Sequence, residues 1–248
     1  MSNGNGNNNF GIFFLGFFIA LGLIGSASYI GKTVKEVKLS NQTIKVKGYA
    51  ERRISSDFAI WRARFSTRSF NLVEAYDLIE GDRIKVLSYL QKSGIPSSNI
   101  DISSVTTTIQ YEITEKGYNT NRISGYTLEQ YVTIVSNDVM LINKVSKAST
   151  TLIKDRIELT SFNPEYYYTN INDLKITMLG EASADARKRA IELAQNSGGN
   201  VGPLRAAAQG VFQITPVNST EVSNYGRYDT STIDKTIKAV VTIEYSIQ

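Results

Sequence analysis

The side chains able to do chemistry in this chain are carboxylates, hydroxyls and amines, because the sequence contains no histidine and no cysteine. These absences exclude the usual general base near neutral pH, the commonest metal ligand, the Ser-His-Asp arrangement, thiol nucleophiles and disulfides. General acid–base catalysis needs two carboxylates that meet across a substrate. The acids of interest are single and fall at expected element ends or on exposed helix faces: Asp57, Glu80, Asp82, Asp101 and Asp185. Capping or solvated charge explains them, so we assign no catalytic residues, no cofactor-binding residues and no metal ligands.

Two further function classes are disfavoured by motif and charge. The sequence contains neither the phosphate-binding pattern G-x-x-x-x-G-K-[ST] nor the dinucleotide pattern G-x-G-x-x-G. The formal net charge is +4, from 27 basic and 23 acidic side chains. So small and scattered an excess does not indicate a nucleic-acid partner.

Three arginines form the first candidate contact surface. Arg62, Arg64 and Arg68 share the even face of an expected strand whose odd positions are mostly apolar. A solvated face is one interpretation. Pairing with carboxylates of a neighbouring copy is a second, because the planar guanidinium suits bidentate contacts. Attraction to anionic lipid is a third.

Three consecutive tyrosines form the second candidate surface. Tyr166, Tyr167 and Tyr168 lie beside an expected loop, where exposed aromatic side chains are typical of interfaces. The alternative is a strand in which alternate tyrosines are packed. We take the three arginines and the three tyrosines as candidate oligomer-interface or membrane-contact residues.

The apolar stretch Phe10–Ile30 determines where these elements are held. It contains no charged residue, and as a helix its 21 residues would span about 31 Å, close to the thickness of a bilayer core. We expect an uncleaved membrane anchor, since a cleavable signal usually has a basic start and a shorter apolar run. Small residues at 26–28 leave a cleaved signal as the alternative. Lys32, Lys35 and Lys38 follow the stretch, and the positive-inside rule would place them in the cytoplasm.

The remaining periodicities predict alternating groups of strands and helices. We expect strands over residues 43–50, 57–70, 100–114, 123–136, 156–168, 204–216 and 235–247, with a turn at 51–53 and an interruption at 163–164. We expect helices over 71–93, 138–153 and 172–197. The stripe expected to be buried on the first is Leu72, Tyr76, Ile79, Val86, Leu87 and Leu90, and on the last Ile176, Leu179, Ala182, Ala186, Ala190, Leu193 and Ala194.

These elements predict an α+β fold, with mixed, largely antiparallel sheets and packed helices after one N-terminal transmembrane helix. The expected organisation is a disordered tail (1–9), the anchor (10–31), a linker (32–42) and one domain (43–248).

Four ordered stretches resemble the SIMPL domain family, also called DUF541. They are IKVKGYAERRISSD, GYTLEQYVTI, ASADARKRAIELAQNSGGNVG and AVVTIEYSI, together covering roughly residues 43 to 247. Ala50 stands where the family often has a second glycine, and Ser56 where it often has proline. The resemblance implies an extracytoplasmic bacterial location, ring-like homo-oligomers in at least one member, and members linked to oxidative-stress defence. It implies no established catalytic residues.

Three functions follow as expectations. The first is a membrane-anchored, non-enzymatic SIMPL-domain protein that forms homo-oligomers at the extracytoplasmic face, in envelope or oxidative-stress defence. The second is a periplasmic module that binds a small molecule or peptide beside the sheet. The third is an enzyme using an unrecognised carboxylate or tyrosine site, which one buried acid of raised pKa in a pocket would support.

Overall fold

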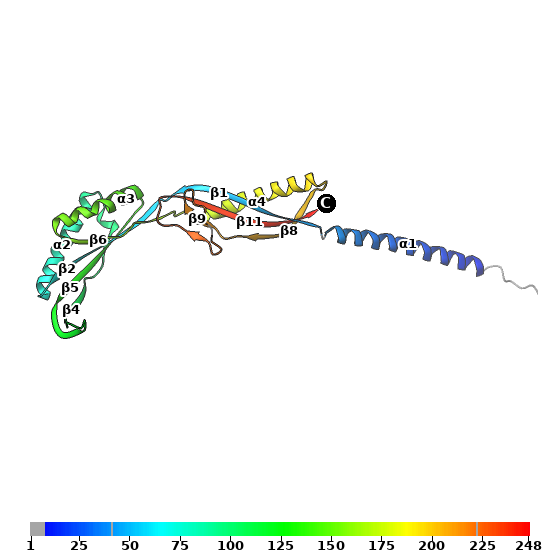
Figure 1. The fold of residues 1–248 in the computed structure, drawn as a ribbon. Coiled ribbons are helices and arrows are strands. Elements are labelled where there is room, and N and C mark those ends of the chain that lie inside the picture. The colour runs from blue at the N-terminus through cyan, green and yellow to red at the C-terminus, as the bar shows by residue number, and fades with distance from the viewer. Residues whose placement is uncertain (1–7, 41, 222) are drawn as a thin grey trace, which may run out of the picture. The chain divides into compact units, whose positions relative to one another are not determined.

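The computed structural model describes residues 8–40, 42–221 and 223–248. Four α-helices and two sheets of mostly antiparallel strands make up this part of the chain, which confirms the α+β prediction (Figure 1). The chain divides into two compact units. The first comprises the residues up to Ala50, Thr177–Gly210 and Ala239–Gln248, and the second comprises Glu51–Ile176 and Val211–Lys238.

Helix α1 (Asn8–Ser40) is continuous and includes Phe13–Lys32, which is long and apolar enough to cross a membrane and contains no buried residue. By length and composition this helix is a candidate membrane span or a signal sequence. The predicted linker over 32–42 is therefore helical as far as Ser40. Of the predicted disordered tail, residues 1–7 lie outside the described residues, whereas Asn8 and Asn9 begin the helix.

The rest of the first unit is a sheet covered by helix α4 (Ile171–Asn196). Its strands are the first part of β1 (Thr43–Ser55), β8 (Val201–Gln209) and the end of β11 (Asp234–Ile247), and β8 pairs antiparallel with β11. The buried stripe of α4 in this unit consists of Met178, Ala182, Ala186, Ala190 and Ala194.

The predicted stripe of α4 was wrong at two large residues, because Ile176 and Leu193 are 70% and 54% exposed. The four alanines of the predicted stripe, spaced four residues apart, are buried as predicted. Their lack of bulk lets the helix backbone come close to the sheet.

The second unit is built on a six-stranded sheet. Its order is β3-β5-β2-β6, with β4 also pairing with β5 and β7 with β2. The strands are β2 (Phe58–Ser69), β3 (Ile100–Ile102), β4 (Thr106–Ile113), β5 (Asn119–Ser136), β6 (Glu158–Ser161) and β7 (Glu165–Tyr167).

Helices α2 (Leu72–Lys92) and α3 (Val139–Ala148) cover one face of this sheet, and the 3-10 helices η1 (Ser97–Asn99) and η2 (Ser149–Asp155) connect the elements. The core contains Trp61, Phe65, Ile79, Leu90, Leu128, Ile134 and Ile142. On α2 the buried line includes Ala75 and Asp82, whereas Leu72 and Tyr76, predicted to be buried, are exposed.

Several strand boundaries differ from the predicted ones. β1 continues to Ser55 through the predicted turn at residues 51–53. The predicted strand over 100–114 is divided into β3 and β4, and the one over 204–216 into β8 and β9 (Gln213–Pro216). In the second unit β9 pairs antiparallel with the start of β11 and parallel with the short β10 (Arg227–Tyr228).

Candidate functional site

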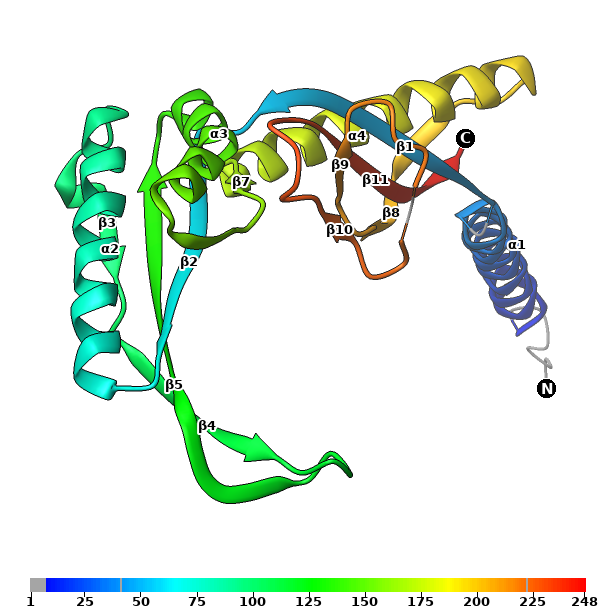
Figure 2. The same cartoon turned by 60° about the vertical axis from the view of Figure 1, so that its left-hand side comes forward.

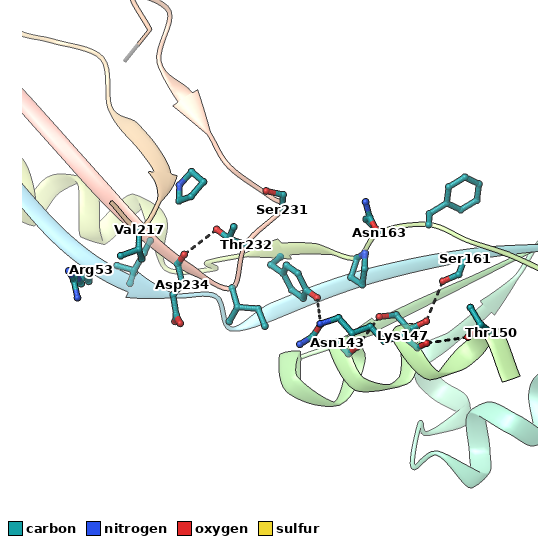
Figure 3. Close-up of a pocket in the computed structure, with 17 residues that line it drawn as sticks. Arg53, Asn143, Lys147, Thr150, Ser161, Asn163, Val217, Ser231, Thr232 and Asp234 are labelled. Atoms are coloured by element: carbon teal, nitrogen blue, oxygen red, sulfur yellow. Dashed lines mark hydrogen bonds between the residues drawn. The ribbon is translucent and has the colours of Figure 1, made fainter. Parts of the chain in front are cut away.

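A groove of about 980 Å³ lies in the second unit between α3, the 161–166 segment and the segment before β11 (Figure 3). A volume of this order matches sites that hold small organic molecules. We call it the α3 groove. Apolar and polar side chains both line it: Ile54, Phe162, Pro164, Pro216, Val217 and Ile233, with Arg53, Asn143, Ser146, Lys147, Thr150, Ser161, Asn163, Tyr166, Ser231, Thr232 and Asp234.

Helix α3 supplies the polar wall. Asp138 caps the helix by accepting a hydrogen bond from the Leu141 N–H at 2.9 Å, as the sequence predicts. Asn143 and Lys147 are four residues apart, so they project from the same side of the helix. The Tyr166 hydroxyl donates to Asn143 Oδ1 at 3.3 Å, and burial raises the pKa of Tyr166, which keeps this hydroxyl protonated at neutral pH.

The opposite wall is the segment that leads into β11, and Asp229 holds it in shape. The Asp229 carboxylate accepts from the Ser231 N–H at 3.0 Å, from the Ser231 hydroxyl at 2.6 Å and from the Thr232 hydroxyl. Lys235 is fully buried, donates to the Thr232 carbonyl and lies 3.6 Å from Asp229 Oδ2. Burial opposes ionisation of Asp229, but these hydrogen bonds and the Lys235 charge hold its pKa below the ordinary value.

The groove has charges at both ends. Arg53, Val217 and Asp234 lie at one end, and Lys147 and Thr150 at the other (Figure 3). Within the part of the chain that the structure describes, neither cation makes an ion pair. Arg53 has the carboxylate of Asp234 at its own end, whereas no acid lines the end with Lys147. The arrangement can hold a molecule with an apolar body and a negative end.

The three candidate arginines lie on the face of the second unit's sheet opposite its helices, and each has a carboxylate partner in its own chain. The distances are 3.9 Å from Arg62 to Glu165, 3.2 Å from Arg64 to Glu129 and 3.3 Å from Arg68 to Glu158. Contacts to a neighbouring copy would have to compete with these pairs, each worth about 0–1 kcal/mol on a surface.

The three tyrosines do not form one exposed cluster. Tyr166 is 5% exposed and belongs to the core, which corrects its assignment as an exposed interface residue. The cause is strand alternation in β7, where Tyr166 faces α3. Tyr167 and Tyr168 are half-buried, and the Tyr167 hydroxyl donates to Glu165.

Most of the single acids have structural partners. Asp57 accepts from the N–H and hydroxyl of Thr169, both at 2.8 Å, while Glu80 and Asp82 pair with Arg83 and Lys85. Asp185 pairs with Arg189 at 2.7 Å, one turn further along α4. Among the described residues there is no group of three metal-ligating side chains.

Asn143 and Lys147 of the groove, and Asp229 and Lys235 that support it, were not predicted from the sequence as site residues. One signal was available for Lys235, because it has the parity of Ile237, Ala239 and Val241 and so falls on the buried face of its strand. No local pattern indicated that α3 and the 229–235 segment line one groove, since about 80 residues separate them in sequence.

The fold and the groove together describe an α+β protein with an N-terminal apolar helix and an open groove lined by apolar and polar side chains. A family model, SIMPL, described as "Protein of unknown function (DUF541)", matches residues 44–245. The chain therefore belongs to the SIMPL family, as its motifs indicated. No curated protein sequence matches the chain.

Proposed function

We propose that this chain is a membrane-anchored, non-enzymatic protein of the bacterial extracytoplasmic face that self-associates through the β4–β5 arm. We define the arm as residues 106–125, in which β4 pairs antiparallel with the first part of β5. Figure 2 shows the two strands continuing past the end of α2. The observation that carries the proposal is the open edge and uncovered apolar face of this arm.

The arm has an apolar face that is exposed in the described structure. Ile109, Tyr111, Ile113 and Ile123 are all exposed, and Tyr111 lies opposite Ile123 in the register. A two-stranded hairpin is marginally stable by itself in water. Contiguous apolar side chains of this kind mark contact surfaces in soluble domains.

The free edge of β4 suits a second copy of the same strand. In the described structure β4 pairs with β5 alone, and its sequence, TTTIQYEI, contains one charge and neither lysine nor proline to block pairing. An antiparallel pair of β4 strands has a two-fold axis, so the same surface serves both copies. If the two-fold axis passes through Ile109 or Gln110, Glu112 of one copy lies opposite a threonine of the other copy. The two Glu112 carboxylates then do not face each other.

A cysteine scan tests this interface, because the chain has no native cysteine. Single cysteines replace each residue from Thr106 to Ile113 in the full-length protein in native membranes. We expect disulfide-linked dimers at positions near the axis, with the yield falling on both sides, and none from the exposed control Ser98→Cys. Monomers at every position of the scan would refute the interface.

The extracytoplasmic location follows from the family resemblance and the apolar helix, and it runs against the three lysines after that helix. We give more weight to the extracytoplasmic location that the family resemblance implies than to the modest bias from these three lysines. Protease digestion of intact cells, with intact-mass measurement of the mature chain, tests sidedness and cleavage together. A protected domain would place the protein in the cytoplasm, and a mass lacking α1 would make it a cleaved, soluble periplasmic protein.

The non-enzymatic role is supported by the hydrogen bonds and ion pairs of four candidate acids. Each carboxylate already has a partner within the fold: Asp57, Glu80, Asp82 and Asp185. Envelope or oxidative-stress defence is the physiological setting implied by the family resemblance. Peroxide sensitivity of a deletion strain, reversed by the full-length chain, tests that setting.

Binding of a small molecule or peptide is the second candidate function, and the α3 groove favours it. The groove combines an apolar lining with two cations that make no ion pair among the described residues. A ligand that binds the folded state stabilises it by RT ln(1 + [L]/Kd), so the melting temperature rises with the ligand concentration. Concentration-dependent thermal stabilisation of the full-length protein is therefore the expected result.

A further inference from the structure

One turn of α3 presents two hydrogen-bond donors to the groove. Lys147 supplies an ammonium group with no ion-pair partner in the described part of the chain. Asn143, one turn earlier, uses its Oδ1 to accept from the buried Tyr166 hydroxyl. That bond fixes the amide orientation and leaves Asn143 Nδ2 as the donor available to a ligand.

Apolar residues line the same groove as this donor pair. They include Ile54, Val217, Ile233 and Pro164. Since Asp234 lies at the Arg53 end, the uncompensated positive charge of the groove is at Lys147. A ligand that matches both features has an apolar body and a single anionic end.

We propose that the α3 groove binds an organic carboxylate, with the carboxylate on Lys147 Nζ and Asn143 Nδ2 and the apolar body over Ile54 and Ile233. Charge-assisted hydrogen bonds from an ammonium to a carboxylate are the stronger class of hydrogen bond, and the planar amide adds direction. The carboxylate has two chemical sources, a short acyl chain or the C-terminus of an apolar peptide. This inference rests on the ligand-binding function proposed above and gives its ligand class.

The only tryptophan of the chain reports on this site. The Trp61 indole N–H donates to Ser161 Oγ at 3.1 Å, and Ser161 Oγ in turn lies 3.4 Å from the Ser146 carbonyl. Ser146 and Ser161 both line the groove, whereas Trp61 itself is buried in the core. A molecule that contacts Ser161 therefore changes the environment of the indole, and the emission of Trp61 follows binding without any label.

The test titrates the full-length chain in dodecyl maltoside micelles and follows Trp61 emission, with protein-free micelles as the blank. The probes are hexanoate, the peptide N-acetyl-Leu-Val-Leu with a free carboxyl end, and the same peptide amidated. We expect saturable binding of at least one acid probe. The amidated peptide should bind at least about tenfold more weakly than the acid peptide, which corresponds to a loss of about 1.4 kcal/mol of binding free energy. Hexanoate binding identifies an acyl source, and binding of the acid peptide alone identifies a peptide C-terminus.

Variants on α3 locate the carboxylate. Lys147→Met is expected to weaken binding of the acid probe by about tenfold or more. Lys147→Arg is expected to retain most of the affinity. The matched control is Lys144→Met, on the same helix but outside the groove lining, which should bind like the unchanged protein. Because Lys147 lies in the last turn of α3, melting curves verify that each variant is folded.

The failures are distinguishable. Equal binding of the acid and amide peptides, or unchanged affinity in folded Lys147→Met, overturns the carboxylate assignment and leaves ligand binding intact. No saturable change with any probe, in emission or melting temperature, overturns both the assignment and the ligand-binding function. Neither result affects the cysteine scan of β4, which tests self-association independently.

Discussion

Gly48 of β1 lies against the backbone of Ala182 in α4, in the first unit. A methyl group on the Cα of Gly48 would overlap the Ala182 carbonyl oxygen and come within 2.7 Å of the Ala186 Cβ. Beside this contact, the N–H of Tyr49 donates to Asp185 of the same helix at 2.9 Å. The glycine of the first SIMPL-like stretch and the alanines of the third are therefore one packing arrangement, in which neither partner has room for a larger side chain.

Replacing Gly48 by alanine is expected to destabilise the first unit by about 1–3 kcal/mol, the usual cost of overpacking, because α4 must move away from β1. Urea unfolding of the full-length protein in detergent measures the change. The control is Gly81→Ala in α2, where a methyl group meets open space and should stabilise the helix by about 0.5–1 kcal/mol. Equal stability of Gly48→Ala and the unchanged chain would show that the contact is loose.

Asp185 makes the stability of the first unit depend on pH in the acid range. The hydrogen bond from the Tyr49 N–H, helped by Arg189, holds the pKa of Asp185 below its ordinary value. Since the folded state then binds fewer protons than the unfolded state, this contribution is complete above the unfolded pKa of about 3.9 and is lost as the pH falls through the folded pKa. Asp185→Asn should therefore flatten the acid limb of a stability–pH profile.

Asp229→Asn is expected to destabilise the second unit by about 3–5 kcal/mol, because it leaves the buried Lys235 ammonium without its counter-charge. The double variant Asp229→Leu/Lys235→Met should recover most of that loss, since it removes both charges. Chemical unfolding of the two variants measures the difference. If the single variant is no less stable than the double variant, the pair does not hold this segment.

The Asp229→Asn variant should also regain stability as the pH rises. Burial already lowers the pKa of Lys235, and Asp229 partly opposes that shift. Without Asp229 the folded pKa falls further below the unfolded value of about 10.4, so the unfolded state binds more protons between the two pKa values and stability increases with pH. The measurement is the stability difference from the unchanged chain at pH 7 and at pH 9.5, and it should be smaller at pH 9.5.

Asn71 is a helix cap whose loss has a predictable cost. Its Oδ1 accepts from the N–H groups of Val73 at 2.8 Å and Glu74 at 3.3 Å. Asn71→Ala should destabilise the protein by about 1 kcal/mol, whereas Asn71→Asp should keep the cap. Thermal unfolding compares the two, and equal losses would show that the side-chain acceptor is not the cause.

Local sequence patterns correctly predicted the elements whose ends are set by capping, glycine or proline residues at those ends. Asn71 and Gly94 delimit α2 as predicted, and Asn163-Pro164 interrupts the strand between β6 and β7. They failed where pairing with an adjacent strand sets the end of an element. β1 continues through Glu51-Arg52-Arg53 because β11 pairs beside it. On α4 they placed Ile176 and Leu193 on the buried stripe together with the alanines, since apolarity does not show how close a helix lies to its sheet.

The amino-acid sequence by itself determined the apolar N-terminal helix, the α+β class, the family and the absence of histidine and cysteine chemistry. Each is a property of composition or of residues close together along the chain. Only the tertiary structure placed Gly48 under Ala182, buried Lys235 beside Asp229, and brought Asn143 and Lys147 to the wall opposite Ile233. Gly48 and Ala182, and α3 and Ile233, are far apart in sequence, and Lys235 is buried beside Asp229 by the way its segment packs. Such packing of side chains on sheets leaves no trace in local periodicity.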